Sequence, residues 1–293
     1  MTDDPLVSIC LLTWNRASVI RRSLDSLLGQ TYKHFELIIN DDCSNDATSE
    51  ISHAYAAKDQ RVRYCRNETN LKYSGNSNAA VERSRGEFIV FAHDGDYYHP
   101  ELIEQWVRVL QDHPTAALAF CGLNVMNDSA EVVRTIIEPF PALINGQELL
   151  HNMLKRFDSP IFGITMVRRR CIDQVGKFDS RFPRITDVDM WLRLLAKFDA
   201  AYVNQPLIDV MPREKGHENS EVNWNIIQQL TEIRETNIRR AFDAQSNQLD
   251  QFLAKYRTDR RKLYLRSIAW CFYHGRIKPG FSGLMRLLSK QGG

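Results

Sequence analysis

The sequence lacks the cysteine pairs that build disulfide frameworks and zinc sites. Its six cysteines are scattered along 293 residues and include no C-x-x-C pair, a spacing typical of reduced, structural thiols. Long apolar runs are lacking too, since none approaches the roughly 18 residues that span a bilayer. The first five residues, Met-Thr-Asp-Asp-Pro, are acidic where a secretory signal would be basic. We therefore expect a cytoplasmic protein.

Net charge and glycine-rich nucleotide motifs are also scarce. The 38 basic and 36 acidic residues leave a formal charge of only +2, which argues against a nucleic-acid binder that is basic throughout. No G-x-G-x-x-G follows the first apolar run and no G-x-x-x-x-G-K-[ST] occurs anywhere, which disfavours a Rossmann dehydrogenase and a P-loop NTPase. What is present, 43% hydrophobic and 25% charged residues, is the composition of a soluble globular protein.

Apolar runs alternate with amphipathic segments in the first half of the chain. The runs are continuously apolar, which is typical of parallel strands buried on both faces. We expect strands over residues 6–12, 35–39, 62–65 and 87–92, and helices over 19–28, 46–57 and 77–83. The middle mixes helices with short strands, and from about Val222 the pattern is helical almost to the end. This order predicts one α/β domain with a helical C-terminal appendage.

Polar clusters follow the expected strands at the sheet edge where parallel strands place ligands. Asp94-Gly95-Asp96 follows the fourth strand. Two carboxylates one residue apart can bind Mg²⁺ or Mn²⁺, and the glycine between them lets the backbone turn sharply. A turn without any ligand is the alternative interpretation.

A second acidic cluster, Asp41 to Asp46, follows the second strand. Ser44 or Asn45 can cap the next helix, but two consecutive acids exceed what capping needs. An acid at this place can accept a hydrogen bond from a nucleotide base or from a ribose hydroxyl.

Two further acids, Asp187 and Asp189, lie at the start of an expected helix whose apolar stripe includes Trp191 and Leu194. Stabilisation of the helix N-terminus by negative charge explains either acid, and it does not exclude a base role for Asp187. His217 lies in the polar segment 213–220. His217 either contacts a metal or a phosphate, or it is a loop histidine that is exposed to solvent.

Taken in order, these clusters resemble the family-2 glycosyltransferases, inverting enzymes of the GT-A fold, of the type that acts on bacterial cell-surface polysaccharides. The resemblance covers roughly residues 6–220 and depends on seven pieces in the family's order and spacing. The pieces are Val7 to Arg16, Gln30-Thr31-Tyr32 with Phe35 to Ile39, the Asp-Asp-x-Ser-x-Asp element at 41–46, Asn70 with Gly75 to Asn78, Arg85 to Ile89 with His93 to Asp96 and Pro100-Glu101, Val175 to Asp179, and Asp187 to Arg193.

The resemblance implies an α/β, Rossmann-like and mostly parallel central sheet flanked by helices. Residues 1–221 would form the GT-A catalytic domain, with a nucleotide-sugar half over about 1–98 and an acceptor half over about 99–221. Residues 222–293 would form a helical, basic C-terminal extension.

The resemblance also implies roles for matching residues. Asp94 and Asp96 match the family's D-x-D motif, which holds the ribose, the diphosphate and a divalent Mn²⁺ or Mg²⁺ ion. His217 fits a histidine that contacts the metal or the diphosphate, and Asp187 matches the carboxylate that acts as base on the acceptor. The remaining residues assigned to the nucleotide sugar are Thr13, Asn15, Arg16, Asp41, Asp42, Lys72 and Asn78.

The chain departs from the family pattern at four places. Cys43 stands where the family has a glycine, Thr186 where a glutamate often precedes the base, and Tyr97 where the run of acids after the D-x-D motif would continue. Ser77 stands in place of the arginine of a common Arg-Asn pair, so a cation for the diphosphate is expected from Lys72 or elsewhere. These departures bear on the identity of the donor.

We therefore expect a glycosyltransferase that moves a sugar from a nucleoside-diphosphate sugar to a hydroxyl of a glycan or lipid-linked acceptor. A UDP-sugar is the first expectation and a dTDP-sugar the second, and the metal would stabilise the leaving diphosphate. Two alternatives stay open. A sugar nucleotidyltransferase would release pyrophosphate, and a catalytically degenerate module would bind a sugar nucleotide without turnover.

The near-neutral total charge divides unequally along the chain. Residues 254–293 carry ten basic residues and one acid, interleaved with aromatic and aliphatic side chains. Such a segment can lie on an anionic surface, here the inner face of the cell membrane. Alternatively, its apolar side can pack on the catalytic domain or on a second copy in a homodimer.

Overall fold

The computed structural model describes residues 4–155, 159–183, 185–212, 224–241 and 253–258, together with 261, 262, 265 and 269. The chain forms two compact units, Met1–Pro212 and Arg213–Gly293. The boundary expected after residue 221 lies outside the described residues.

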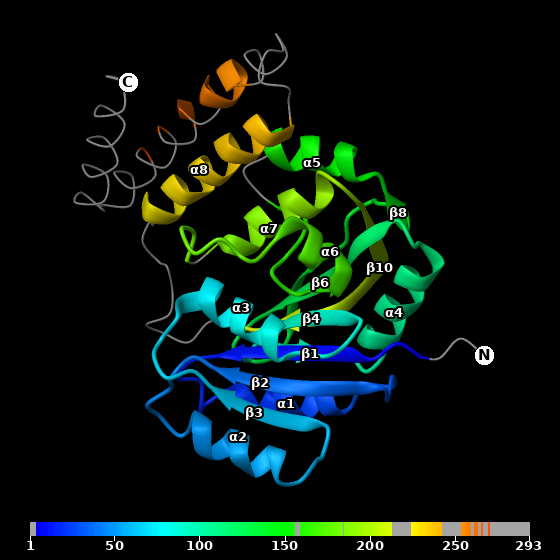
Figure 1. Cartoon of the computed structure of the whole chain (residues 1–293), viewed down its shortest axis with the longest axis vertical. Coiled ribbons are helices and arrows are strands. Elements are labelled where there is room, and N and C mark those ends of the chain that lie inside the picture. Colours follow the sequence, from blue (N-terminus) through cyan, green and yellow to red (C-terminus); the bar gives the residue numbers. More distant parts are fainter. Residues whose placement is uncertain are drawn as a thin grey trace. The chain divides into compact units, whose positions relative to one another are not determined.

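A single sheet runs through the first unit (Figure 1). Its strand order is β3-β2-β1-β4-β9-β6-β10-β5, and β7 pairs with β6 while β8 pairs with β10. The strands are β1 (Val7–Thr13), β2 (Phe35–Asp41), β3 (Val62–Arg66), β4 (Phe88–His93), β5 (Tyr97–Tyr98), β6 (Ala116–Met126), β7 (Val132–Ile136), β8 (Leu143–Ile144), β9 (Thr165–Arg168) and β10 (Asp199–Val210).

The direction of the strands decides where their polar ends meet. Strands β3, β2, β1 and β4 are parallel to one another, and so are β6 and β10. Strand β9 runs antiparallel between β4 and β6, so β6 and β10 run in the same direction as β1. The carboxyl ends of all six strands therefore lie at one edge of the sheet.

The expected α/β fold class is confirmed, and the structure adds detail to the pairing. Parallel pairing holds for the strands predicted in the first half of the chain, whereas β5, β7, β8 and β9 pair antiparallel with their neighbours. Strands β1 and β2 are buried along their whole length, which explains their continuous apolar sequences. Strand β9 is buried along its whole length as well, but its sequence, Thr-Met-Val-Arg, is short and only half apolar, and gives no indication of its direction.

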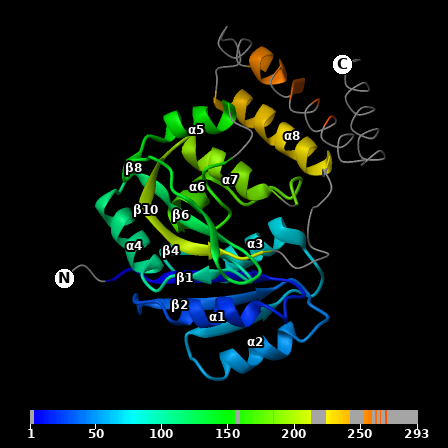
Figure 2. The ribbon, with the colours of Figure 1, turned by 180° about the vertical axis from the view of Figure 1, so that it is seen from behind.

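Helices cover both faces of the sheet (Figures 1 and 2). Helices α1 and α4 contribute apolar side chains to the main core with β1 and β4, and α3, α6 and α7 pack together with the opposite face. The helices of the first unit are α1 (Ile20–Leu28), α2 (Thr48–Ala56), α3 (Lys72–Arg83), α4 (Leu102–Asp112), α5 (Gly146–Lys155), α6 (Arg169–Val175) and α7 (Thr186–Leu195).

Helix α3 begins at Lys72, five residues before the helix expected from Ser77. Its first turns contain Gly75 and several small polar residues, which have low helix propensity. Tertiary contacts override that propensity, because Asn76 is buried and bonds through its side chain to Asn40 and Asn67. A helix that starts earlier brings its N-terminal turn to the carboxyl edge of the sheet.

The cysteines behave as the sequence predicts. All five cysteines in the described part of the chain carry unpaired thiols, and Cys271 lies outside it. Burial raises the pKa of the Cys121 thiol to about 12, which makes this group unreactive.

The second unit contains helix α8 (Trp224–Ala241) and a further helical segment over 253–258. Tyr256 is buried, and its hydroxyl donates a hydrogen bond to the Thr231 carbonyl at 3.4 Å. No helix in the described residues is long and apolar enough to cross a membrane. Most of the basic range 254–293 lies outside the described residues, so membrane contact and protein packing both stay predictions.

Candidate active site

The turn that carries Asp94, Gly95 and Asp96 is held in place by helix α1. Ser23 Oγ accepts a hydrogen bond from the Gly95 N–H at 2.9 Å and donates one to the Asp96 carbonyl at 2.8 Å. Arg22 donates to the Gly95 carbonyl at 3.0 Å. Gly95 has a φ of +89°, a conformation that L side chains rarely adopt. The glycine and the helix together fix the position of both acids.

Each acid of this turn is bonded to a different part of the unit. Arg16 Nε donates to Asp94 Oδ1 at 2.9 Å, and both side chains are nearly buried. The Met211 N–H donates to Asp96 Oδ1 at 3.0 Å, which joins the turn to the end of β10. The turn thus lies between the N-terminal loop after β1 and the last strand of the sheet.

The acids after β2 are enclosed by hydrogen-bond donors. Asp41 Oδ1 accepts from the Ser44 N–H at 2.9 Å and from its hydroxyl at 2.5 Å, and Tyr64 donates to Oδ2 at 2.6 Å. Asp42 Oδ1 accepts from Asn67 Nδ2 at 2.9 Å and from the Leu71 N–H at 2.8 Å. These contacts tie the end of β2 to β3 and to the start of α3.

Thr13 and Asn15 lie beside these acids, since Thr13 pairs in register with Asp41. The Thr13 hydroxyl is buried and makes no hydrogen bond within the described residues. Asn15 has a φ of +54°, and its Oδ1 accepts from the Asn45 N–H at 2.8 Å. Cys43, where the family resemblance expects glycine, has a φ of +66°. The left-handed conformation is therefore retained without the glycine.

Lys72 and Asn78 have different surroundings, although both lie on α3. Lys72 is exposed and follows Leu71, whose N–H bonds Asp42. The Asn78 side chain instead donates to the Phe178 carbonyl at 2.9 Å and accepts from its N–H at 2.8 Å. Lys72 therefore lies at the start of α3, next in the chain to the residue that bonds Asp42, while the Asn78 amide joins α3 to the loop before α7.

Asp187 lies in the first turn of α7, where three other elements converge. A Cβ atom added to Gly163 would lie 2.9 Å from His93 Nε2 and 3.0 Å from Asp187 Oδ2, so these side chains flank the same point. Tyr73 Oη lies 3.2 Å from His93 Nε2. Burial raises the pKa of Asp187 to about 6, although the backbone N–H groups of Val188 and Asp187 itself act in the opposite direction.

Asp189 lies two residues after Asp187 in the same helix, but its carboxylate is paired with an arginine. Its Oδ2 accepts from Arg193 Nε at 2.7 Å, and the same arginine donates to the Val175, Gly176 and Lys177 carbonyls. The Asp189–Arg193 pair thereby holds the loop after α6 against α7. Asp187 is the acid of this helix whose carboxyl lies, together with the His93 ring, next to Gly163.

The metal ligands expected from the sequence are described only in part. Asp94 and Asp96 lie on the turn after β4, whereas His217 lies outside the described residues. Across the described ranges, no three histidine, cysteine or acidic side chains form a group that could hold a metal ion.

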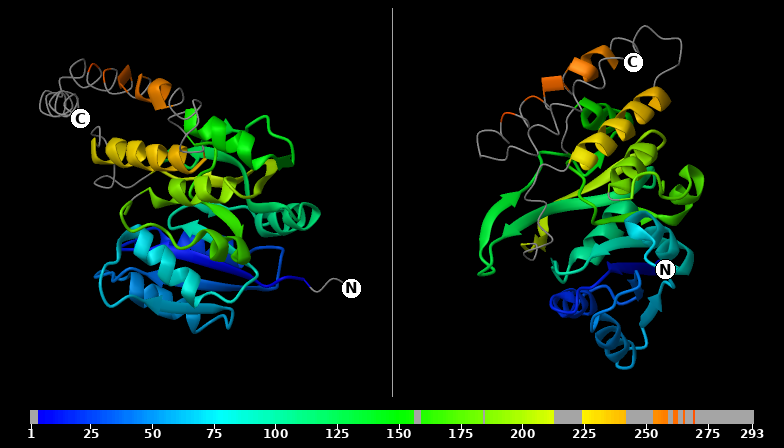
Figure 3. Two further views of the ribbon diagram at one scale, coloured as in Figure 1. Left: turned by 45° about the horizontal axis from the view of Figure 1, so that its top comes forward. Right: turned by 90° about the vertical axis from the view of Figure 1, so that its left-hand side faces the viewer.

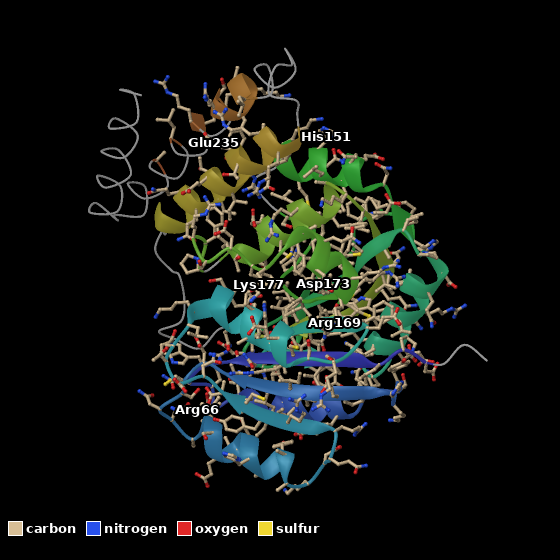
Figure 4. The ribbon with its side chains drawn as sticks, in the orientation of Figure 1. Arg66, His151, Arg169, Asp173, Lys177 and Glu235 are labelled. Atoms are coloured by element: carbon tan, nitrogen blue, oxygen red, sulfur yellow. The ribbon has the colours of Figure 1, made fainter. Side chains whose placement is uncertain are left out.

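Three residues near the site were not predicted from the sequence: Tyr73, His93 and Arg66. Arg66 extends from the end of β3 (Figure 4) and donates to the Ser44 carbonyl at 2.7 Å, with Nε 3.9 Å from Asp41 Oδ2. A position at the end of a parallel strand was a usable signal for Arg66 and for His93. No pattern along the chain indicates that Tyr73 meets His93.

Sequence comparisons with a family model and with individual proteins all match glycosyltransferases. Residues 8–176 match the sequence model described as Glycosyl transferase family 2. EpsE of Bacillus subtilis (strain 168), named as a glycosyltransferase, is 27% identical over 200 residues, which cover 66% of this chain and 68% of EpsE. TuaG of the same strain, named as a teichuronic acid biosynthesis glycosyltransferase, is 28% identical over 201 residues, with coverages of 68% and 75%. WcaA of Escherichia coli (strain K12), named as a colanic acid biosynthesis glycosyl transferase, is 25% identical over 198 residues, with coverages of 68% and 69%.

Solved structures share the fold of this chain. TarS (residues 1–349) of S. aureus in complex with UDP-GlcNAc aligns with a TM-score of 0.68 and 19% identity, covering 85% of this chain and 71% of TarS. The mannosyltransferase PcManGT of Pyrobaculum calidifontis, in complex with GDP-Man and Mn²⁺, aligns with a TM-score of 0.58 and 14% identity, with coverages of 98% and 76%. The family match spans more than half of the chain, on a sheet whose acidic strand ends meet at one edge, and the protein therefore belongs to glycosyl transferase family 2.

Proposed function

We propose that this glycosyltransferase transfers a sugar from a UDP-sugar to a hydroxyl group of a glycan or lipid-linked acceptor, with inversion at the anomeric carbon. The observation that carries the proposal is the placement of Asp187 beside His93, with a pKa that burial raises to about 6, on the same unit as the Asp94–Asp96 turn. The names of TuaG and WcaA support a role in polysaccharide biosynthesis. The complex of TarS with UDP-GlcNAc supports UDP as the nucleotide.

The donor would bind at the ends of β1, β2 and β4. Thr13 offers a buried hydroxyl with no hydrogen bond in the described structure, and Asn15 lies two residues further along the chain. The Asp41–Asp42 pair holds these loops in shape. Arg16 and Lys72 supply cationic groups near the acids, which suits a diphosphate. In this role Asp94 contacts the ribose and remains paired with Arg16.

Asp187 would act as the base on the acceptor. A carboxylate with a pKa near 6 is mostly ionised at neutral pH and is a stronger base than a carboxylate at the ordinary value. As the acceptor oxygen attacks the anomeric carbon, its proton passes to Asp187. The bond from that carbon to the diphosphate oxygen breaks on the opposite side, so the nucleoside diphosphate leaves and the anomeric configuration inverts.

The acids of the turn after β4 fit a divalent metal that is completed by its substrate. Two carboxylates one residue apart are too few ligands for a closed protein site, and they suit Mg²⁺ or Mn²⁺, which take further oxygens from phosphate and water. We propose Asp94 and Asp96 as the protein ligands, with His217 as a further candidate. The ion would neutralise negative charge that develops on the leaving diphosphate.

Calorimetry with the full-length protein tests the proposal. UDP, UDP-GlcNAc, UDP-glucose, dTDP-glucose and GDP-mannose are each titrated with and without Mn²⁺, and product release is followed by chromatography. We expect the UDP ligands to bind most tightly, a stronger response with Mn²⁺, and loss of the Mn²⁺-dependent part in Asp96→Asn but not in Asp128→Asn, an exposed residue of the turn after β6. Failure of every nucleotide to bind would reject the proposal. Release of pyrophosphate instead of UDP would indicate a nucleotidyltransferase.

A further inference from the structure

A row of polar side chains crosses four neighbouring strands in the acceptor half of the sheet. Tyr97 in β5 pairs in register with Asp209 in β10, Asp209 with Asn124 in β6, and Asn124 with Thr135 in β7. Residues that lie directly opposite one another point to the same face of a sheet. We call these four residues, together with His99, the cross-strand row.

Hydrogen bonds connect four members of the cross-strand row, and the fifth, Tyr97, is joined to them by a ring contact. Thr135 Oγ1 donates to Asn124 Oδ1 at 2.8 Å, and Asn124 Nδ2 donates to Asp209 Oδ1 at 2.8 Å. His99 Nε2 lies 3.0 Å from the same Asp209 oxygen, and the His99 ring packs edge-on against Tyr97 at 5.5 Å. The hydrogen bonds restrain the side chains of Thr135, Asn124, Asp209 and His99.

The row keeps binding groups open to solvent. All the hydrogen bonds that the described residues make to the Asp209 carboxylate fall on Oδ1, and that side chain is 16% exposed. Oδ2 therefore remains available to a ligand. The His99 side chain is 36% exposed and Tyr97 is 37% exposed. A network that served only to stabilise the sheet would gain more from apolar cross-strand pairs.

The position of the row relates it to the Asp94–Asp96 turn. Tyr97 directly follows Asp96, and the Met211 N–H, two residues after Asp209, bonds Asp96 Oδ1 at 3.0 Å. Asn124 and Asp209 lie near the carboxyl ends of β6 and β10, at the same edge as the donor-site residues. From there the row leads away from β4 to β7, where the β6–β7 strands extend from the body of the unit (Figure 3, right).

The register of β10 supports a role in binding. It shifts against β6 between Val203 and Pro206, and again between Pro206 and Asp209. Such bulges bend a strand and re-aim its side chains, and they are frequent next to functional sites. Here the shifts bring Asp209 opposite Asn124, so the irregular part of the strand creates the contact between the two polar groups.

We propose that the cross-strand row is the acceptor subsite and that it binds a saccharide. A carboxylate oxygen, an imidazole and a hydroxyl can bond the hydroxyl groups of a sugar ring, and the exposed Tyr97 ring can cover one of its C–H faces. The inference rests on the proposed function, because it assigns an acceptor to the same reaction. It commits to the sugar part of the acceptor and not to a lipid tail.

Saturation-transfer NMR on the full-length protein, with UDP and Mn²⁺ present, tests the subsite. The probes are the methyl glycosides of glucose, galactose, N-acetylglucosamine, mannose, rhamnose and glucuronic acid, each at millimolar concentration. We expect at least one to bind. Asp209→Asn should weaken its binding by about tenfold, the loss that follows from one hydrogen bond to a charged group, and Tyr97→Ala by about fivefold, the loss of one aromatic contact. Asp128→Asn is the matched control and should bind like the wild type.

The outcomes separate this inference from the proposed function. If UDP binds and no glycoside does, or if Asp209→Asn and Tyr97→Ala bind glycosides like the wild type, the subsite is wrong while the donor proposal stands. If UDP itself does not bind, the proposed function is wrong, and the subsite is judged from glycoside binding without nucleotide. Equal UDP affinity and equal Tm in all variants show that a lost signal reports on the row and not on unfolding.

Discussion

The acids after β2 and the acid at the start of α7 differ in how many hydrogen-bond donors surround them. Asp41 is fully buried and accepts hydrogen bonds from Ser44 and from Tyr64, a partner on the neighbouring strand. Asp187 is partly buried, and the hydrogen bonds that lower its pKa come from backbone N–H groups of its own helix turn. Burial outweighs those bonds, so the pKa of Asp187 rises to about 6.

The comparison teaches that the donors around an acid, more than its burial, separate a structural role from a chemical one. Asp41 connects three segments of the chain, and its loss would leave several donors without a partner. The Asp187 carboxyl bonds backbone N–H groups of its own helix turn and lies, together with the His93 ring, next to Gly163. Three substitutions and one pH dependence test this distinction, beginning with the change expected to have the largest effect.

Replacing Asp187 by asparagine should reduce donor turnover by about 10²–10⁴-fold, because the amide cannot take up a proton. The affinity for UDP should not change, since Asp187 is assigned to the acceptor. Turnover is measured as UDP release, and affinity by calorimetry. Wild-type turnover in Asp187→Asn would show that this residue is not the base. It would also show that Asp187 does not differ from Asp41 in having a chemical role.

Replacing Asp41 by alanine should lower the free energy of unfolding by about 3 kcal/mol, because the Tyr64 hydroxyl and two Ser44 donors lose their acceptor. Urea denaturation of the isolated variant gives the value. Asp128→Ala, at an exposed turn position, should stay within about 0.5 kcal/mol of the wild type. Equal losses in the two variants would show that Asp41 has no structural role.

Replacing Gly163 by alanine should destabilise the protein by about 2 kcal/mol, since the new methyl group would lie within 3.0 Å of both His93 and Asp187. Turnover should fall as well, because the two side chains must move apart. Gly176→Ala is the control: this glycine has a φ of +85° but open space around it, so about 1 kcal/mol of strain is expected without loss of turnover. A Gly163→Ala protein as active as Gly176→Ala would argue against a close His93–Asp187 approach.

The smallest effect is expected on stability as a function of pH. The pKa of Asp187 is about 6 in the folded protein and near 3.9 in an unfolded chain. Between these values the folded protein holds a proton that the unfolded chain has released, so stability falls as the pH rises from 4 to 6. Above pH 6, Asp187 costs the fold about 1–2 kcal/mol, a figure reduced for its partial exposure. Asp187→Asn should therefore have a higher Tm than the wild type at pH 7 and an equal Tm at pH 4. A constant Tm difference would contradict the raised pKa.

Local patterns predicted much of the fold and the place in it of several candidate donor-site residues, whose role stays a prediction. The boundaries of β1 to β4 lie within two residues of those expected, because strands buried on both faces are continuously apolar. Thr13, Asp41 and Asp94 were found at the strand ends because parallel strands collect ligands there. For these three residues, the position at the end of a predicted strand was enough to place them at the carboxyl edge of the sheet.

The remainder of the site depends on contacts between distant segments. Asn78 bonds Phe178, 100 residues later in the chain, and no local pattern indicates that pairing. Tyr73 meets His93 only because α3 begins at Lys72, in a polar segment whose helix propensity is low. The contact of Asp189 with Arg193, four residues apart on one helix, was visible in the sequence. It distinguishes Asp189 from Asp187 without any knowledge of the fold.

The two register shifts around Pro206 make the cross-strand row sensitive to chain length. Because side chains alternate between the faces of a strand, one residue added or removed between Val203 and Asp209 would turn Asp209 to the opposite face. Strands β1 to β4 would keep their pairing, since β10 does not contact them in the ladder. Insertion or deletion of one codon would thus disrupt the proposed acceptor subsite while the strands that carry the candidate donor site stay paired, which is a short route to new acceptors on an old fold.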